Sequence, residues 1–328
     1  MATFPPTQEL RDEGYETVHE YRRRLGIEYN FIPQWVSPEM CRTISEEQCQ
    51  ELDASFEQGV RSNRKLLEHH KQRRAQGFPS SMRILVLLVQ WTNHADKPLI
   101  PIEEIDQVFN SDKVGDDTVP TGSVSRYFQV NSYGKFDVTA EVVPWMMTDN
   151  TEEAYASFGD SGRSPELANA LTPILEELDS SGFDFSPYDQ DGDGVLDLTV
   201  VLHSGYAAEL GGNDCVTGAT REQRIASHAS SFGGNWNSTD GFQLGPYAVA
   251  SAFRQRCDTN VVRLGVIAHE MLHPFGIPDL YDFDTQDRTL GNVGGLGRYD
   301  IMVSMAEKAP LRLKLCTTLT ISIHFLIF

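Results

Sequence analysis

The sequence predicts an α/β fold in which a twisted mixed sheet packs against helices. Residues 82–91 form a nearly continuous apolar run, which is typical of a buried strand. Residues 123–146 read as a helix, a turn at Gly134 and then an alternating strand. A third stretch, residues 265–282, begins as an apolar helix that carries polar side chains at helical spacing. We therefore expect an α/β (α+β) domain that includes this polar helix.

Further elements are predicted from the same patterns of periodicity and turn residues. Helices are expected at residues 101–110 and 164–178, and a strand is expected at residues 198–203. Residues 224–232 and 246–253 are separated by a Gly-rich turn and predict a β-hairpin. The edge strand of such a pair binds a peptide backbone by β-addition in many complexes, and the sequence does not choose between the two strands.

The polar helix contains the motif His-Glu-x-x-His. His269 and His273 are at positions i and i+4, so both imidazoles leave the same face and reach one zinc ion at about 2.0–2.1 Å. Glu270 lies about 100° round the helix, where it contacts a metal-bound water rather than the metal. Gly276 ends the helix, and the chain then bends back to offer Asp279 as a third ligand. Three protein ligands and one water form an open, catalytic zinc site.

A chance match to this motif is the alternative interpretation, and it arises in roughly one chain of this length in a hundred. The flanks favour a metal site, because a buried helix with two histidines and a glutamate needs a partner for those polar groups. Burial of the helix is predicted by Val261, Val262, Leu264, Val266, Ile267, Met271 and Leu272. His203 and His228 lie in predicted strands, and we expect them to be second-layer or core histidines; an approach to the active site is the alternative.

A second motif with metal-binding character spans residues 188–203. Asp189, Asp191, Asp193 and Asp197 stand at positions 1, 3, 5 and 9 of a calcium loop, and the backbone carbonyl of Val195 stands at position 7. Position 12 is a valine instead of the glutamate of an EF-hand, so the loop is expected to enter a strand directly. Four carboxylates so close together repel one another without a cation, which favours structural calcium. A solvated acidic turn is the alternative.

Composition places limits on the partners of the chain. Its 328 residues are enough for two domains, or for one large domain with a pro-segment. The net charge of −20 predicts no binding to nucleic acid or to anionic membranes. None of the cysteines is in a zinc-binding pattern. Cys215 and Cys257 either form a disulfide or are free buried thiols, and the same alternatives apply to Cys41 and Cys49. Cys316 is the fifth cysteine, for which no pairing partner is expected.

The two ends of the chain differ from the middle. Residues 1–10 contain no secretory signal, which indicates either a cytosolic protein or a missing start. Residues 1–80 are polar, and Arg73-Arg74 is either a processing site or a solvated helix end. The apolar residues 315–328 are too few to span a bilayer, which needs about 20 residues. We interpret residues 311–328 as an atypical tail, either truncated or a hydrophobic anchor or core strand.

The pattern HExxHxxGxPDxYD from His269 to Asp282, together with GGLGRYDIM at residues 294–302, resembles the immune inhibitor A-like zinc metallopeptidases. These are metzincin-like, with Asp279 in place of the last histidine. The resemblance covers roughly residues 80–305 and includes the acidic loop. It implies a zincin fold in which Met302 forms the Met-turn beneath the zinc. The alternative is that Met302 is an ordinary core methionine. The resemblance also implies that residues 1–80 are a pro-region-like segment and linker, followed by a zinc metallopeptidase catalytic domain at residues 81–310.

The resulting hypothesis is a zinc-dependent endopeptidase with one catalytic zinc, at least one structural calcium and Glu270 as the general base. Tyr281 and Tyr299 either stabilise the oxyanion or are structural. Competing hypotheses are a zinc exopeptidase or other zinc hydrolase, and a non-catalytic, calcium-stabilised, protease-like binding module. We expect protein or peptide substrates and a monomer without a stable membrane span. The family resemblance implies an extracellular protein.

Overall fold

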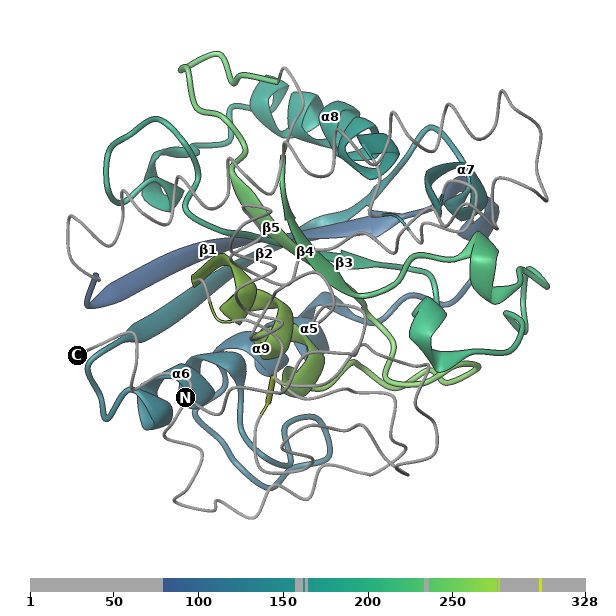
Figure 1. Ribbon diagram of the computed structural model, residues 1–328, viewed down its shortest axis with the longest axis horizontal. Helices are drawn as coiled ribbons and strands as arrows, with labels where there is room; N and C mark the ends of the chain where they lie inside the picture. Colours follow the sequence, from purple (N-terminus) through teal and green to yellow (C-terminus); the bar gives the residue numbers. More distant parts are fainter. Residues whose placement is uncertain are drawn as a thin grey trace, which may run out of the picture. The chain divides into compact units, whose positions relative to one another are not determined.

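A mixed five-stranded sheet is the centre of the computed structural model, which describes residues 79–156, 162, 165–232, 236–275, 277 and 301–302 (Figure 1). The strands are β1 (Ser81–Gln90), β2 (Asp137–Met147), β3 (Thr199–His203), β4 (His228–Ser231) and β5 (Pro246–Ser251). Their order is β2-β1-β3-β5-β4. Neighbouring strands are parallel except β4, which pairs antiparallel with β5. The predicted mixed sheet and hairpin are therefore confirmed.

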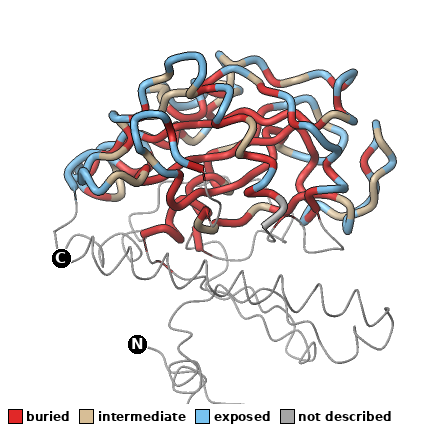
Figure 2. Tube along the Cα trace, turned by 90° about the horizontal axis from the view of Figure 1, so that it is seen from above, coloured by how far each residue is buried: buried red, intermediate tan, exposed pale blue. Residues whose placement is uncertain are grey.

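β1 shows why the sheet has a core on each face. Its apolar residues alternate between the two sides, as the period of a strand requires. Ile84, Val86 and Leu88 belong to one buried cluster, which includes residues of the helices below the sheet in Figure 1. Leu85, Leu87 and Val89 belong to the other cluster, which includes residues of the helices above it. The continuous apolar run of β1 is the consequence of burial on both faces. Buried residues gather along the centre of the fold (Figure 2).

Helices form the two outer layers. α5 (Ile102–Asn110), α6 (Val124–Asn131) and α9 (Leu264–Leu272) lie below the sheet, and α7 (Glu152–Ala156) and α8 (Pro165–Ser180) lie above it (Figure 1). Short 3₁₀ turns complete the described elements: η1 (Thr92–His94), η2 (Ser186–Tyr188), η3 (Ala208–Leu210), η4 (Arg221–Gln223) and η5 (His273–Phe275). Within the described ranges, no helix combines the length and apolar character needed to cross a membrane.

Local details agree with the sequence prediction except at the helix that carries the histidines. The turn at Gly134 is present, and both Tyr133 and Gly134 have positive φ. The helix, however, starts at Leu264, so the prediction that Val261 and Val262 belong to it was wrong. Val261 instead forms an isolated antiparallel bridge with Phe253, and both valines are buried. Their apolar character reflects burial, which an extended segment satisfies as well as a helix.

Candidate metal centre

α9 positions the three polar side chains of the His-Glu-x-x-His motif. The helix is apolar around most of its circumference and packs against β5 and α6. His273 follows its last residue and begins η5, because Pro274 has no N–H to continue the α-helical bonds. The backbone of His273 keeps helical angles of φ −60° and ψ −48°, so the i, i+4 relation to His269 is retained. The two rings lie 4.9 Å apart, centroid to centroid.

Hydrogen bonds to backbone carbonyls select one tautomer for both histidines. His269 Nδ1 lies 2.7 Å from the oxygen of Ile301, and His273 Nδ1 lies 2.9 Å from the oxygen of Ile277. Because a carbonyl oxygen only accepts hydrogen bonds, each Nδ1 must carry the proton. Each Nε2 therefore has the lone pair that a metal ion requires, and the Nδ1 bond orients the ring.

Glu270 is placed between the two Nε2 atoms. Its carboxylate oxygens lie 3.9 Å from His269 Nε2 and 3.9 Å from His273 Nε2. All three side chains are buried, and their nitrogen and oxygen atoms form a group that could hold a metal ion. This juxtaposition agrees with the sequence prediction. It places a carboxylate within 3.9 Å of both Nε2 atoms.

Several predicted site residues lie outside the described part of the chain: Asp279, the expected third ligand, and Tyr281 and Tyr299, the two tyrosines considered for the oxyanion. Gly276, which was expected to end the helix, is outside it as well. Met302 is described and is fully buried in the same cluster as Met271 of α9. Its neighbour Ile301 supplies the carbonyl that orients His269, so the backbone at residue 301 contacts the candidate metal centre.

The acidic loop, residues 189–194, forms a compact turn. Asp189 accepts hydrogen bonds from the N–H groups of Gly192, Asp193 and Gly194, at 2.9–3.1 Å. Carboxylate oxygens of Asp189, Asp191 and Asp193 lie within 4.8 Å of one another. Gly192 and Gly194 have positive φ, as the sharp turn at this point requires. The loop enters β3 through residues 195–198 and forms no EF-hand helix, as predicted.

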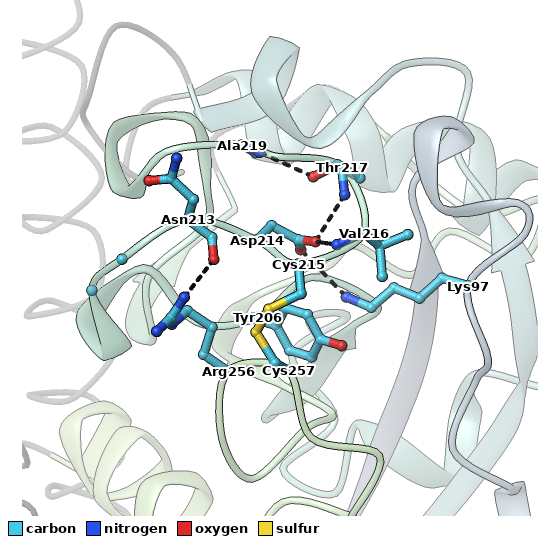
Figure 3. The surroundings of a disulfide bond; sticks show 12 residues. Lys97, Tyr206, Asn213, Asp214, Cys215, Val216, Thr217, Ala219, Arg256 and Cys257 are labelled. Atoms are coloured by element: carbon cyan, nitrogen blue, oxygen red, sulfur yellow. Dashed lines mark hydrogen bonds and ion pairs between the residues drawn. A yellow bond between two sulfur atoms is a disulfide. The ribbon is translucent and has the colours of Figure 1, made fainter.

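A disulfide joins the loop that follows β3 to the loop that follows β5. Cys215 and Cys257 are bonded with a Cα–Cα distance of 5.6 Å, which confirms one of the two alternatives for this pair (Figure 3). Arg256 donates a hydrogen bond to the oxygen of Asn213, at 2.8 Å, beside the same bond. Cys41, Cys49 and Cys316 lie outside the described residues.

A second buried group of polar side chains was not predicted. Atoms of His94, Glu152 and Asp214 lie within 4.8 Å of one another, and all three residues are buried. His94 Nε2 is 3.5 Å from Glu152 Oε2, Lys97 Nζ is 3.6 Å from Asp214 Oδ2, and His203 Nδ1 is 3.9 Å from Glu152 Oε1. Nothing local in the sequence marks this group, because its members come from segments far apart in the chain.

Burial perturbs the ionisation of this group. Loss of solvation raises the pKa of Glu152 to about 8 and lowers the pKa of His94 to about 4. The same cause lowers the pKa of Lys97 to about 8 and the pKa of His203 well below 6.5. We name these four residues, with Asp214 and Arg224, the buried polar cluster.

Comparison with known proteins gives one family and several relatives. Residues 104–306 match the family model described as the catalytic domain of immune inhibitor A peptidase M6. Immune inhibitor A from Bacillus thuringiensis subsp. alesti is 28% identical over 249 residues, which cover 65% of this chain and 35% of the relative. Pre-pro-metalloprotease PrtV from Vibrio cholerae serotype O1 (strain M66-2) is 27% identical over 183 residues, which cover 49% of this chain and 19% of the relative. The match thus spans about a third or less of these relatives.

Proposed function

This chain belongs to the immune inhibitor A peptidase M6 family, and from that membership we propose that it is a zinc-dependent endopeptidase. The observation that carries the proposal is the pair of histidines whose Nδ1 atoms donate to carbonyl oxygens, which turns two Nε2 lone pairs toward the Glu270 carboxylate. Two imidazoles and a nearby carboxylate are a donor set suited to zinc. In this proposal His269, His273 and Asp279 hold the metal.

Zinc held by these residues would supply a water with a pKa lowered toward 7 and a Lewis acid for the scissile carbonyl. Glu270, whose carboxylate oxygens lie 3.9 Å from both Nε2 atoms, would accept a proton from the attacking water and deliver it to the leaving amine. The Ile301 and Ile277 carbonyls keep both imidazoles in the required tautomer throughout the cycle. In this proposal Met302, which is fully buried next to Ile301 in the sequence, forms the Met-turn.

β4 is the strand that we propose for binding the substrate backbone. It ends the sheet order of the described strands, and it contacts both α9 and η5. At the opposite edge, the side chain of Asn110 already bonds the N–H and the oxygen of Ala140 in β2, at 2.9 Å each. An extended peptide that pairs with β4 would lie beside the helix that carries the histidines.

We further propose that calcium stabilises the acidic loop through Asp189, Asp191, Asp193 and Asp197 and the carbonyl of Val195. The support is the cluster of Asp189, Asp191 and Asp193 oxygens on a tight Gly-containing turn; Asp197 lies outside this cluster and accepts hydrogen bonds from Gln190. The other expectations also remain proposals: a pro-region-like segment at residues 1–80, a catalytic domain at 81–310, a monomer, protein or peptide substrates and an extracellular location.

The decisive experiment is cleavage of a denatured protein by the full chain, compared with the Glu270→Ala variant at equal zinc content. We expect cleavage by the first and none by the second. Glu103→Ala, which removes an exposed glutamate on α5, is the matched control and should cleave normally. Internal fragments establish an endopeptidase, whereas stepwise loss of terminal residues would establish an exopeptidase. Two folded, zinc-loaded proteins without activity would refute the proposal and favour a binding module.

A further inference from the structure

The buried polar cluster holds the segment that leads into β4. Glu152, fully buried at the start of α7, accepts a hydrogen bond from the N–H of Ile225 at 3.0 Å. Ile225 precedes the first residue of β4 by three positions, and its own oxygen accepts from the N–H of Ala208 at 2.9 Å. A Cβ at Gly205 would lie 2.2 Å from Glu152 Oε1, so a glycine is needed there for the carboxylate to reach Ile225.

Arg224 fixes the other side of the same segment. Its guanidinium is fully buried and donates to the carbonyl oxygens of Gly211 and Gly212, at 2.8 and 2.7 Å. Further bonds reach the oxygens of Tyr206 and Thr220, both at 3.2 Å. One side chain thus ties together the loop after β3 and the turn η4 before β4.

The charges of the cluster are balanced by its own residues. Lys97 lies close to Asp214 and also stacks over the ring of Tyr206, 3.4 Å from its centroid (Figure 3). With Glu152 and Asp214 both ionised, Lys97 and Arg224 cancel their charge. With Glu152 protonated, the group is already cationic. Neither state requires an added cation for charge balance, although the spacing of the ligand atoms would admit one and His94 Nε2 and Glu152 Oε2 accept or donate no hydrogen bond among the described residues.

The segment held in this way ends beside the candidate metal centre. β4 contacts α9 and η5 and pairs with β5, whose last residue Ser251 donates to the oxygen of Gly205 at 2.6 Å. A shift at Ile225 would therefore move β4 relative to His269 and His273. We propose that Glu152 and Arg224 are positioning residues, which place β4 for the backbone of an extended peptide substrate. This inference rests on the proposed peptidase function.

The test compares Arg224→Lys with Arg221→Lys, a matched change at an exposed arginine of η4. The lysine keeps the charge at position 224 and loses the fork of donors. We expect KM for a peptide that spans several subsites to rise about tenfold, with kcat changed less than twofold and zinc content unchanged. The affinity of acetohydroxamate, which binds zinc without a peptide backbone, should stay the same. Arg221→Lys should leave all four quantities unchanged.

A second pair of variants keeps the test valid if Arg224→Lys does not fold. Glu152→Gln retains an oxygen that accepts from Ile225 and should keep KM near the native value, whereas Glu152→Ala should raise it. An unchanged KM in both Arg224→Lys and Glu152→Ala would overturn the inference, as would an equal loss of acetohydroxamate affinity. Loss of one metal equivalent in Glu152→Gln would also overturn it, because the cluster would then be a metal site.

A readout independent of catalysis separates this inference from the proposed function. Amide hydrogen exchange in β4 (His228–Ser231) should be faster in Arg224→Lys than in the native chain and in Arg221→Lys. If the native chain cleaves no peptide and β4 still exchanges faster, the peptidase proposal fails and the anchoring of β4 stands. If exchange in β4 is unchanged, the positioning role fails whatever the activity.

Discussion

Replacing Glu152 by glutamine should remove a pH dependence of stability that burial creates. The pKa of Glu152 is raised from 4.5 to about 8 because the fully buried carboxylate loses its solvation. Between these two values the folded chain keeps a proton that the unfolded chain has released. The unfolding free energy must therefore fall as the pH rises through this interval. A glutamine does not titrate, so the variant should lack this fall.

Neighbouring groups define the interval in which Glu152 acts alone. His94 and His203 have lowered pKa values, and their contribution to stability is lost only as the pH falls below 6.5. Asp214 has a lowered pKa and contributes at still lower pH, while Arg224 stays charged. Lys97 begins to contribute above a pH of about 8. Between pH 6.5 and about 8, Glu152 is therefore the group of the buried polar cluster that changes stability most. At about 1.4 kcal/mol per pH unit, the unfolding free energy falls by about 2 kcal/mol over this interval.

The measurement is urea unfolding of the metal-free native chain and of Glu152→Gln at the two ends of this interval. Subtracting one protein from the other cancels the shared groups whose pKa does not depend on Glu152. The pKa of Lys97 does depend on the Glu152 charge, so the interval ends at about 8, where Lys97 begins to titrate. Glu177→Gln, at an exposed position on α8, is the control and should behave as the native chain does. Equal slopes for the native chain and Glu152→Gln, within about 0.5 kcal/mol, would show that Glu152 is ionised in the folded state and would refute the reasoning.

Two further predictions concern the disulfide and the acidic loop. Changing Cys215 and Cys257 to alanine opens a loop with a sequence separation of 42 and should lower the unfolding free energy by about 4 kcal/mol on the chain-entropy account; equal urea midpoints for the double variant and the oxidised native chain would contradict this. Asp189→Asn weakens the proposed calcium site, so adding calcium should raise the Tm of this variant less than that of the native chain. If calcium does not change the Tm of the native chain, the loop is a solvated acidic turn.

Strong local signals made much of the fold predictable. The apolar run at residues 82–91 identified β1 because both faces of this central strand are buried, so nearly every position is apolar. The hairpin of β4 and β5 followed from two strand-like runs around a Gly-rich turn. The error at Val261 has the opposite cause: a short apolar pair is compatible with a helix and with an extended bridge, and only the partner Phe253 decides between them.

The candidate metal centre was predictable because one helix presents most of it. His269, Glu270 and His273 are close in sequence, and helical geometry alone brings their side chains together. The carbonyls that select the tautomer were not predictable. The oxygen of Ile301 lies 32 positions from His269, and a backbone oxygen has no signature in the sequence.

The buried polar cluster shows what local patterns leave out. The segment Thr92–Lys97 has the composition of an exposed turn, yet His94 is inaccessible to solvent and Lys97 is only 4% exposed. Its burial depends on partners that no spacing rule connects: a carboxylate from Asp214, a ring from Tyr206 and the space left by a missing Cβ at Gly205. Each buried charge here is stabilised by an opposite charge or a polar group from another segment, so the cluster forms only when the distant segments are already close. A group of this kind stabilises one arrangement of the β3–β4 connection over others, which is the property that a substrate-binding edge strand requires.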